Sequence, residues 1–336
     1  MPPRVTLDDV AVACGVSVST VSRALAGRGD LDPSTRARVS SAARSLGYSR
    51  DGDGRGRPRG ARPALFDLVL GHFDSQYAGE VTAGAQRAAA EAGGDLVLTI
   101  ERDAPDDDWP ARIRARGSSG AVLGLILPTR SQLAVLADAG IPLVLLDPRG
   151  DESLPVVSVR TTDESGGRAA GEHLVQTGAR RFIVVSGTPT YRFGRARADG
   201  FVSAVRAAIP DAPIQRLTAD WGERTAFAAA RRAFSGLDTA DGPVGVFACA
   251  DEMAYGVCAA AADRGLRVPE DVRVVGFDDL PWSRRHDPPL TTVRQPIRAM
   301  AAAAVRALAA HAAGAPLERA LVELPATLIA RRSTEV

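Results

Sequence analysis

From residue 64 onward, short apolar runs alternate with stretches of helical periodicity, and this order constrains the fold more than any other feature. The first series of apolar runs covers residues 64–73, 95–100, 121–128 and 141–147. Helical patterns lie between them, as at 80–93 and 131–140. Because the runs are apolar throughout, both faces of each strand must be buried. The pattern predicts a parallel sheet with helices on both faces.

A second series of the same kind follows at 181–187, 214–218, 244–251 and 272–279. Two successive series predict two α/β lobes, and ligands of such folds bind beyond the carboxyl ends of the strands. Acidic residues occur at three of these ends, namely Asp74, Asp251 and Asp278. Each could instead cap the next helix, which is a common role of aspartate at such junctions. Their shared position at the ends of two sheets favours a ligand cleft.

The first fifty residues contain three short helical segments with their own start and stop signals. Thr6 and Asp9 match a capping box, and Gly15 ends the first helix. Ser17 can cap the second helix, and Asp32, followed by proline, opens the third. The residues expected to face inward are Val21, Leu25, Val39, Ala42 or Ala43, and Leu46. Three helices with a tight turn between the first two predict a helix-turn-helix unit.

The second helix has a small and lightly charged surface, which suits the major groove of DNA. Short hydroxyl side chains are suited to phosphate oxygens, while Val18 and Ser19 would face base edges. Arg23 is long enough to reach O6 and N7 of guanine. The candidates for DNA contact are Thr6, Ser17, Val18, Ser19, Thr20, Ser22 and Arg23. The alternative is a solvated Ser/Thr-rich helix in a small bundle, but the coincidence of caps, turn and groove-facing residues favours DNA binding.

Charge is distributed unevenly along the chain, although the net charge is only +1. Residues 1–63 contain 11 arginines and 6 aspartates, whereas the remainder contains 30 basic and 34 acidic residues. The chain has no lysine, so its use of arginine is partly compositional. A basic end on a slightly acidic body suggests a polyanionic partner for that end.

The runs TLDDVAVACGVSVSTVSRALAG and DPSTRARVSSAARSLGY resemble the headpiece of the lactose-repressor (LacI/GalR) family, without gaps from Thr6 to Tyr48. The resemblance implies that Val18, Ser19 and Arg23 occupy base-reading positions. It continues to about residue 333, which implies a two-lobed body like a periplasmic binding protein. No leucine-heptad tail follows ARRSTEV, so a homodimer on double-stranded operator DNA is expected.

The resemblance also assigns residues to a small-molecule effector. The run GTPTYRFGRARADGF implies that Arg197 binds the effector, and Trp221 matches a position where an aromatic ring packs on it. A core tryptophan is the alternative for Trp221. The run VVGFDDLPWSRRHDPPLTTVRQP gives Asp278 a hydroxyl-binding role, whereas Ala250 in CADEMAYG replaces the family's asparagine. The expected effector-binding residues are Asp74, Tyr77, Arg197, Trp221, Asp251, Asp278 and Gln295.

The linker departs from the family pattern. Family members carry a short helical segment whose leucine enters the minor groove, but here arginines alternate with glycines and no leucine lies between Leu46 and Leu65. Glycine and proline disfavour a helix. One interpretation, which we favour, puts arginines along phosphates or in a narrow minor groove. These are Arg55, Arg57 and Arg59. The other is a soluble tether whose charge aids only diffusive encounter.

These observations predict a helix-turn-helix domain at 1–48, a Gly/Arg-rich linker at 49–63 and a two-lobed effector-binding and dimerisation domain at 64–336. Lobe 1 is expected at about 64–160 plus 295–322, and lobe 2 at about 161–294 plus 323–336. The chain would therefore cross between the lobes several times, and such crossings form a hinge that closes over a ligand.

Other classes of protein fit the sequence less well. There is no export signal and no apolar run of the roughly 18 residues that span a bilayer, and three scattered cysteines fit reduced thiols in a cytoplasm. These features argue against a secreted sugar-binding transport protein. The loop SGTPTYRFG lacks Gly-Lys-Ser/Thr, and the four histidines lack metal-ligand spacing. We therefore expect no enzyme, cofactor or metal, but a repressor controlled by an effector, with a sugar favoured over a purine.

Overall fold

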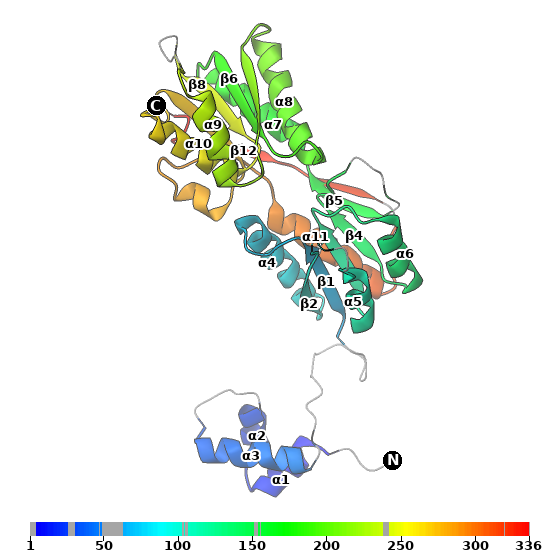
Figure 1. Ribbon diagram of the computed structural model, residues 1–336. Helices are drawn as coiled ribbons and strands as arrows, with labels where there is room; N and C mark the ends of the chain where they lie inside the picture. Colours follow the sequence, from blue (N-terminus) through cyan, green and yellow to red (C-terminus); the bar gives the residue numbers. More distant parts are fainter. Residues whose placement is uncertain are drawn as a thin grey trace. The chain divides into compact units, whose positions relative to one another are not determined.

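The chain divides into two compact units in the computed structural model, Met1–Ala61 and Arg62–Val336 (Figure 1). The structure describes residues 5–25, 31–46, 48, 63–102, 104, 107–150, 154, 156–237, 242–318 and 320–335.

The first unit holds the three predicted helices, α1 Leu7–Cys14, α2 Val18–Leu25 and α3 Pro33–Ser45. The capping box is confirmed: Asp9 N donates to Thr6 Oγ1, and Thr6 N donates to the Asp9 carboxylate. These hydrogen bonds lower the pKa of Asp9 below its ordinary value. Gly15 ends α1 at a φ of 64°, which is confirmed as the predicted stop signal.

The core of this unit is formed by the facing sides of all three helices. Its buried residues are Val10, Ala11, Cys14, Val21, Ala24, Val39 and Ala43, and Leu25 and Tyr48 pack against them. The prediction that Leu46 faces inward is wrong, since it is 39% exposed. The helix α3 ends at Ser45, and Leu46 lies in the turn that follows it.

The second unit begins with lobe 1, a six-stranded sheet in the order β11-β5-β4-β3-β1-β2, with all its pairs parallel. Its strands are β1 Leu65–Leu70, β2 Asp95–Ile100, β3 Gly120–Gly124, β4 Leu143–Leu146, β5 Val157–Thr161 and β11 Leu321–Leu324. Helices α4 Gln76–Glu91 and α11 Ile297–Ala312 cover one face. Helices α5 Trp109–Arg116 and α6 Arg130–Asp138 cover the other.

Lobe 2 repeats this plan with the strand order β12-β10-β9-β8-β6-β7, in which only β12 is antiparallel to its neighbour. Its strands are β6 Arg181–Ser186, β7 Ile214–Thr218, β8 Val244–Ala248, β9 Val272–Asp278, β10 Thr291–Arg294 and β12 Thr327–Ile329. One face is covered by α7 Asp163–Gln176 and α8 Arg192–Ala208, the other by α9 Glu223–Ala233 and α10 Asp251–Asp263. A short 3-10 helix, η1 Pro281–Arg284, follows β9.

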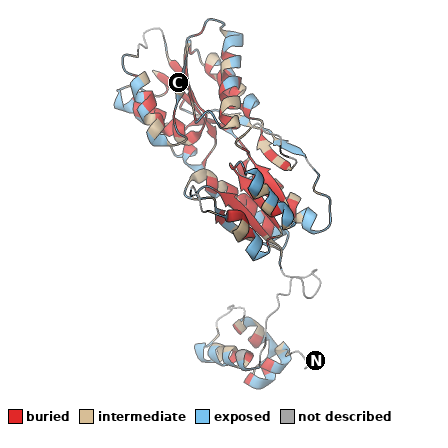
Figure 2. Cartoon of the chain, turned by 45° about the vertical axis from the view of Figure 1, so that its right-hand side comes forward, coloured by how far each residue is buried: buried red, intermediate tan, exposed pale blue. Residues whose placement is uncertain are grey.

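The predicted parallel sheets with helices on both faces are confirmed, and buried residues are concentrated on the strands (Figure 2). The strands β5 and β10 and the edge strands β11 and β12 were not predicted. In β5 the side chains alternate between buried and half-buried. The buried face of the strand packs against α11, and the other face is less fully covered. A pattern of that kind does not meet the rule of uniformly apolar runs that identified the other strands.

Three chain segments pass from one sheet to the other, after β5, after β10 and after β11. The first and third lie side by side, since Thr162 N donates to Leu324 O at 3.1 Å and Ala326 N to Thr162 Oγ1 at 2.9 Å. The second consists of Gln295 and Pro296. Paired short crossings of this kind allow two lobes to rotate against each other as rigid bodies.

Two glycines let α7 and α8 pack unusually closely. A Cβ atom on Gly167 would lie 2.0 Å from Arg197 O, and one on Gly200 would lie 2.1 Å from Glu164 O. Neither position can carry a larger side chain unless the helices move apart. The close packing fixes the start of α7 against the first turns of α8, where the charged residues of the cavity lie.

Candidate functional site

The first candidate site is the exposed surface of α2 in the helix-turn-helix unit. Val21 and Ala24 are buried, and the opposite face exposes Val18, Ser19 and Arg23. Arg23 Nε donates to Ser19 O at 3.4 Å, a weak contact that leaves the guanidinium at the surface. The N-terminal residues of this helix are therefore open to a groove, as base reading requires.

The hydroxyl residues at the start of α2 form a small network. Thr20 N donates to Ser17 Oγ at 3.2 Å, and the Ser17 hydroxyl also bonds those of Ser19 and Thr20. Ser22 is half-buried in the next turn. The hydroxyl of Thr6 donates to Asp9 at 2.7 Å, so its proton is engaged in the cap of α1. The linker candidates Arg55, Arg57 and Arg59 lie outside the described residues.

The second candidate site is a cavity of about 400 Å³ in the second unit, lined by both lobes. Lobe 1 contributes Tyr77 from α4 and Asp147 and Arg149 from the segment after β4. The predicted residues that line it are Tyr77, Arg197, Trp221, Asp278 and Gln295. The cavity lies beyond the carboxyl ends of the strands, where the two-lobed architecture is expected to hold a ligand.

Arg197 is the central cation of the cavity, although its side chain is only 3% exposed. Its Nε pairs with Asp163 Oδ1 at 2.9 Å, and its Nη1 donates to Cys249 O at 2.9 Å and lies 3.6 Å from Asp278 Oδ1. The guanidinium also lies over the ring of Phe277, 3.8 Å from its centroid. Charge-assisted bonds and a ring contact on several sides hold the guanidinium in one orientation.

A second arginine links the lobes. Arg192 Nη2 lies 2.8 Å from Asp163 Oδ2 in lobe 2 and 3.5 Å from Asp147 Oδ1 in lobe 1. Arg192 N donates to Arg149 O at 2.7 Å, and the Arg149 guanidinium lies 5.0 Å from the centroid of the Tyr191 ring. These contacts join the two rims of the cavity.

Several polar atoms at the cavity are buried without a hydrogen-bond partner among the described residues. They include Tyr77 Oη, Gln295 Oε1 and Trp221 Nε1, whereas Asp147 Oδ1 makes no hydrogen bond but lies 3.5 Å from Arg192 Nη2. An unpartnered buried polar group is costly, so these atoms call for a ligand or water that bonds them. Burial raises the pKa of Tyr77 well above its ordinary value, which keeps its hydroxyl available as a donor. The three atoms together suit a ligand with several hydroxyl groups.

Asp278 ends β9 with its carboxylate at the cavity. Gln295 Nε2 donates to Asp278 Oδ1 at 2.5 Å, which leaves the second carboxylate oxygen for another partner. Burial raises the pKa of Asp278 well above its ordinary range, while Arg197 acts in the opposite direction. The carboxyl group thus connects the cavity to the lobe crossing at Gln295.

Aromatic rings form one wall of the cavity. The Trp221 ring lies 4.9 Å from that of Phe193 and 5.5 Å from that of Tyr191, measured between centroids. Gly187 makes room for the indole, since a Cβ atom there would lie 2.2 Å from it. Trp221 therefore has both features that the sequence left open: it packs against the core of lobe 2 and it lines the cavity.

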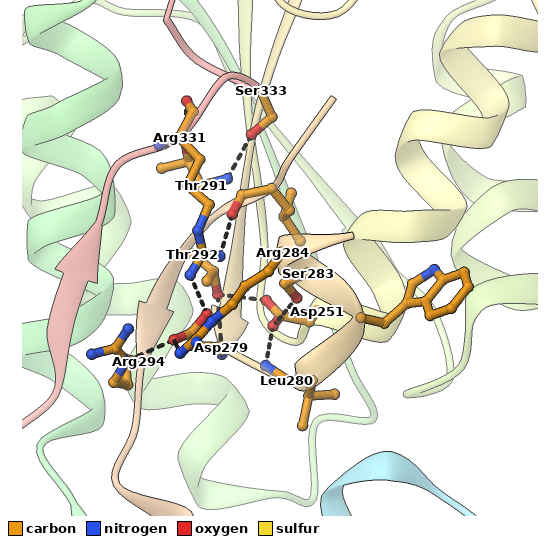
Figure 3. Close-up of polar contacts among 12 residues, drawn as sticks. Asp251, Asp279, Leu280, Ser283, Arg284, Thr291, Thr292, Arg294, Arg331 and Ser333 are labelled. Carbon is orange, nitrogen blue, oxygen red and sulfur yellow. Dashed lines mark hydrogen bonds and ion pairs between the residues drawn. The ribbon is translucent and has the colours of Figure 1, made fainter. Parts of the chain in front are cut away.

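Two predicted effector-binding residues are not at the cavity. Asp74 is 91% exposed and its carboxylate pairs with His72 Nδ1 at 2.8 Å. Asp251 is completely buried, and its carboxylate accepts hydrogen bonds from Leu280 N and Ser283 Oγ, at 2.8 and 2.6 Å, and from Thr292 Oγ1 (Figure 3). Asp251 therefore stabilises the loop after β9, and we leave both residues out of the proposed effector site.

Four further residues at or next to the cavity were not predicted from the sequence, namely Asp147, Asp163, Tyr191 and Phe193. Asp147 directly follows β4, at the end of the apolar run IPLVLLD, and so carried the same strand-end signal as Asp278. Asp163 begins α7 directly after the unpredicted strand β5, so its position at a strand end was hidden. Tyr191 and Phe193 lie at the start of α8, in the same segment as Arg197.

Metal and membrane sites are not found in the described part of the chain. Its residues contain no cluster of three or more His, Cys, Asp and Glu side chains that could hold a metal ion. Among them there is also no helix that is both long and apolar enough to cross a membrane.

The buried carboxyl at position 147 predicts a pH dependence. The pKa of Asp147 is raised from an ordinary value of 3.8 to about 7, because burial and the charge of Asp163 raise it by more than Arg197 and Arg192 lower it. Between about pH 4 and 7 the folded chain then binds a proton that the unfolded chain has lost. The contribution of Asp147 to the free energy of unfolding should therefore fall as pH rises through this window, by at most about 1.4 kcal/mol per pH unit.

Substituting Asp147→Asn should consequently flatten the pH dependence and stabilise the chain more at pH 8 than at pH 5. Urea unfolding at both values measures the effect. Asp138→Asn, at the exposed end of α6, is the control and should leave the pH dependence unchanged. If Asp147→Asn changed the free energy of unfolding by the same amount at pH 5 and pH 8, the raised pKa of Asp147 would be contradicted.

Comparisons with known proteins add to this geometry. Residues 6–51 match the profile of bacterial regulatory proteins of the lacI family, and residues 172–334 match a periplasmic binding protein-like domain. The uncharacterized HTH-type transcriptional regulator in the aml 5' region of Streptomyces limosus is 35% identical, over 98% of this chain and 94% of its own.

Two solved structures resemble nearly the whole chain. The transcriptional regulator CelR in complex with cellobiose has a TM-score of 0.70 and 27% identity, over 98% of this chain and 100% of its own. The lac repressor dimer bound to operator and the anti-inducer ONPF has a TM-score of 0.73 and 25% identity, over 99% and 100%.

Proposed function

Since the chain belongs to the lacI family of bacterial regulatory proteins, we propose that it is a transcriptional repressor whose affinity for operator DNA depends on a sugar bound between its lobes. One observation carries this proposal: the same chain has an exposed helix-turn-helix surface and an interlobe cavity with unpartnered polar atoms. The likeness to a cellobiose complex and to an operator-bound dimer supports both halves.

The headpiece would bind as one of a symmetric pair on a pseudo-palindromic operator. Val18, Ser19 and Arg23 lie on the exposed face of α2 and would meet base edges, with Arg23 on a guanine. Ser17, Thr20 and Ser22, with the start of the helix, would bind phosphates and fix the register. Thr6 would contribute through its position at the start of α1.

In the cavity, Arg197 and Asp278 would bind adjacent hydroxyl groups of the sugar. A planar guanidinium and a carboxylate provide directed donors and acceptors, and Asp278 retains one oxygen for this purpose. Tyr77 and Gln295 would supply further bonds from their unpartnered atoms. Trp221 would pack its ring on an apolar face of the sugar.

Regulation would follow from the difference in affinity of the sugar for the closed and open lobes. The ligand changes DNA binding only if it favours one arrangement over the other. A 100-fold change in operator affinity corresponds to about 2.7 kcal/mol, which a few differential hydrogen bonds can supply. The chain would act in the cytoplasm and by binding alone, without a catalytic step, as its regulator relatives suggest.

Two measurements on the full-length protein test the proposal. Band-shift assays with the DNA upstream of its own gene should give a sequence-specific complex. Thermal unfolding with cellobiose, maltose, xylobiose, ribose, arabinose and adenine should show a raised Tm for a sugar, since a ligand at 100 times its Kd adds about 2.7 kcal/mol. Adding that sugar to the DNA complex then shows whether it releases or tightens the operator. The absence of a sequence-specific complex would refute the proposed role as a regulator. The absence of a Tm increase with every sugar would refute a sugar as the effector.

The arginines of the linker give a separate prediction. Replacing Arg55, Arg57 and Arg59 by alanine should weaken operator binding and reduce its salt dependence. The slope of log K against log salt should become shallower by about 0.9 for each phosphate that the variant no longer neutralises. A salt titration of operator binding measures this slope. If the slope and the affinity stay as in the wild type, the linker acts only as a tether.

A further inference from the structure

Asp278 reaches the cavity from an unusual stretch of backbone. Asp278 has a φ of 125° and Asp279 a φ of 56°, both in the left-handed region. A residue other than glycine keeps such a conformation only when its surroundings hold it there. The position of the Asp278 carboxylate therefore depends on what anchors Asp279.

The Asp279 side chain is anchored by arginines from three different segments. Its carboxylate is 1% exposed and accepts hydrogen bonds from Arg331 Nη2 at 2.5 Å, Arg294 Nε at 2.6 Å and Arg284 Nη2 at 3.4 Å (Figure 3). Burial alone would raise the pKa of Asp279, but the bonds from Arg331 and Arg294 lower it below its ordinary value. Asp279 is thus a buried carboxylate with its partners in place.

Arg331 is itself held firmly, which makes it a suitable anchor. Its Nη1 donates to Leu290 O at 2.8 Å, its N donates to Thr291 Oγ1 at 2.8 Å, and Thr291 Oγ1 donates to its carbonyl at 2.7 Å. Two residues on, Ser333 Oγ accepts from Thr291 N and donates to Val274 O, at 2.8 and 2.6 Å. The segment after β12 is therefore attached to both β9 and β10, the strands that lead to Asp278 and Gln295.

We propose that Arg331 and Asp279 are positioning residues for the effector, which hold the Asp278 carboxylate at the cavity without touching the ligand themselves. The proposal rests on the proposed function, since it concerns the same cavity. Arg294 directly precedes Gln295, so the same anchor also fixes the bond between Gln295 and Asp278. A displaced Asp279 would release the strand end and the lobe crossing together.

A simpler role for Asp279 would be only to adopt the left-handed backbone conformation, without any need for its carboxylate. A glycine at this position distinguishes that role from the anchoring role. Asp279→Gly adopts a φ of 56° without strain but lacks the carboxylate. If conformation alone matters, this variant should bind the effector like the wild type. If the anchor matters, it should bind more weakly.

The experiment compares full-length wild type with Asp279→Gly, Arg331→Met and the control Arg332→Met. Arg332 is the neighbouring arginine, 70% exposed, and lies 3.7 Å from an Asp287 carboxylate that is 93% exposed. Crystal structures report the φ of Asp278 and the distance from Asp278 Oδ1 to Gln295 Nε2. Calorimetric titrations with cellobiose, maltose, xylobiose and ribose report Kd at 20 °C, with the folded fraction checked by circular dichroism.

We expect the hydrogen bond between Asp278 and Gln295 to be broken in Asp279→Gly and Arg331→Met. Sugar affinity should fall about tenfold or more, which is the effect of removing one charge-assisted bond. Arg332→Met should match the wild type.

An unchanged bond between Asp278 and Gln295 in the crystal structures of both variants overturns the inference. So does a lower Tm with an unchanged Kd, which is the result of a merely structural role. If no sugar binds the wild type, the proposed function fails and the crystal structures still decide the positioning role.

Discussion

Replacing Arg197 by methionine is expected to lower the free energy of unfolding of the two-lobed body by about 3–5 kcal/mol and to abolish sugar binding. The guanidinium is the partner of Asp163 and Asp278, whose side chains are 1% and 7% exposed. Methionine keeps the length of the side chain but leaves the Asp278 carboxyl group buried without its cation, and Asp163 with Arg192 as its remaining partner. Asp278 can avoid the cost only by taking up a proton, so the loss of stability should be larger at pH 8 than at pH 5.

Urea unfolding at the two pH values and calorimetric titration measure these effects. Arg206→Met is the matched control, since Arg206 is an exposed residue of the same helix, and it should change stability by less than about 0.5 kcal/mol. The double variant Arg197→Met/Asp278→Asn should regain part of the stability, because it removes the charge that Arg197→Met leaves unpaired. If Arg197→Met and Arg206→Met lowered the free energy of unfolding by equal amounts, the central role of Arg197 would be contradicted.

Replacing Val21 by aspartate should abolish sequence-specific DNA binding while leaving the body folded. Val21 is fully buried where the three headpiece helices meet. An unpaired carboxylate there costs several kcal/mol, and a domain of about fifty residues has little stability to lose. The headpiece has a hydrophobic core of its own, so its unfolding should leave the core of the body intact.

Band-shift assays and thermal unfolding test this prediction. Operator affinity should fall at least about 100-fold, whereas the main thermal transition and sugar binding should match the wild type. Val12→Asp is the control for stability, because Val12 belongs to α1 but is 83% exposed. If Val21→Asp also lowered the temperature of the thermal transition of the body, the independent folding of the two units would be refuted.

Much of the headpiece could be predicted from the sequence, because its signals are local. A capping box at Thr6 and Asp9 and a glycine at position 15 set the bounds of α1 through contacts within four residues. The prediction for Leu46 failed because periodicity was extended one residue past the end of α3. The uniformly apolar strands were equally readable, while β5, with one face less covered, was not.

The candidate effector site was less predictable, as the predictions for Asp74 and Asp251 illustrate. Asp74, Asp251 and Asp278 all follow strands, but only Asp278 lines the cavity. Asp251 is turned into the loop after β9 by Leu280, Ser283 and Thr292, which lie 29 to 41 residues away in sequence. No local pattern distinguishes an aspartate with such partners from one that faces a ligand.

The sequence by itself determined the three headpiece helices, the exposed face of α2 and the two parallel sheets, because caps, glycines and apolar runs act over a few residues. Only the tertiary structure decided which carboxyl groups share a cavity with Arg197 and which segment supports them. Asp147 and Asp163 meet Arg192 from different lobes, and Arg331 reaches Asp279 across 52 residues of sequence. Such encounters depend on strand order and on three crossings between lobes, which the packing of the whole body sets.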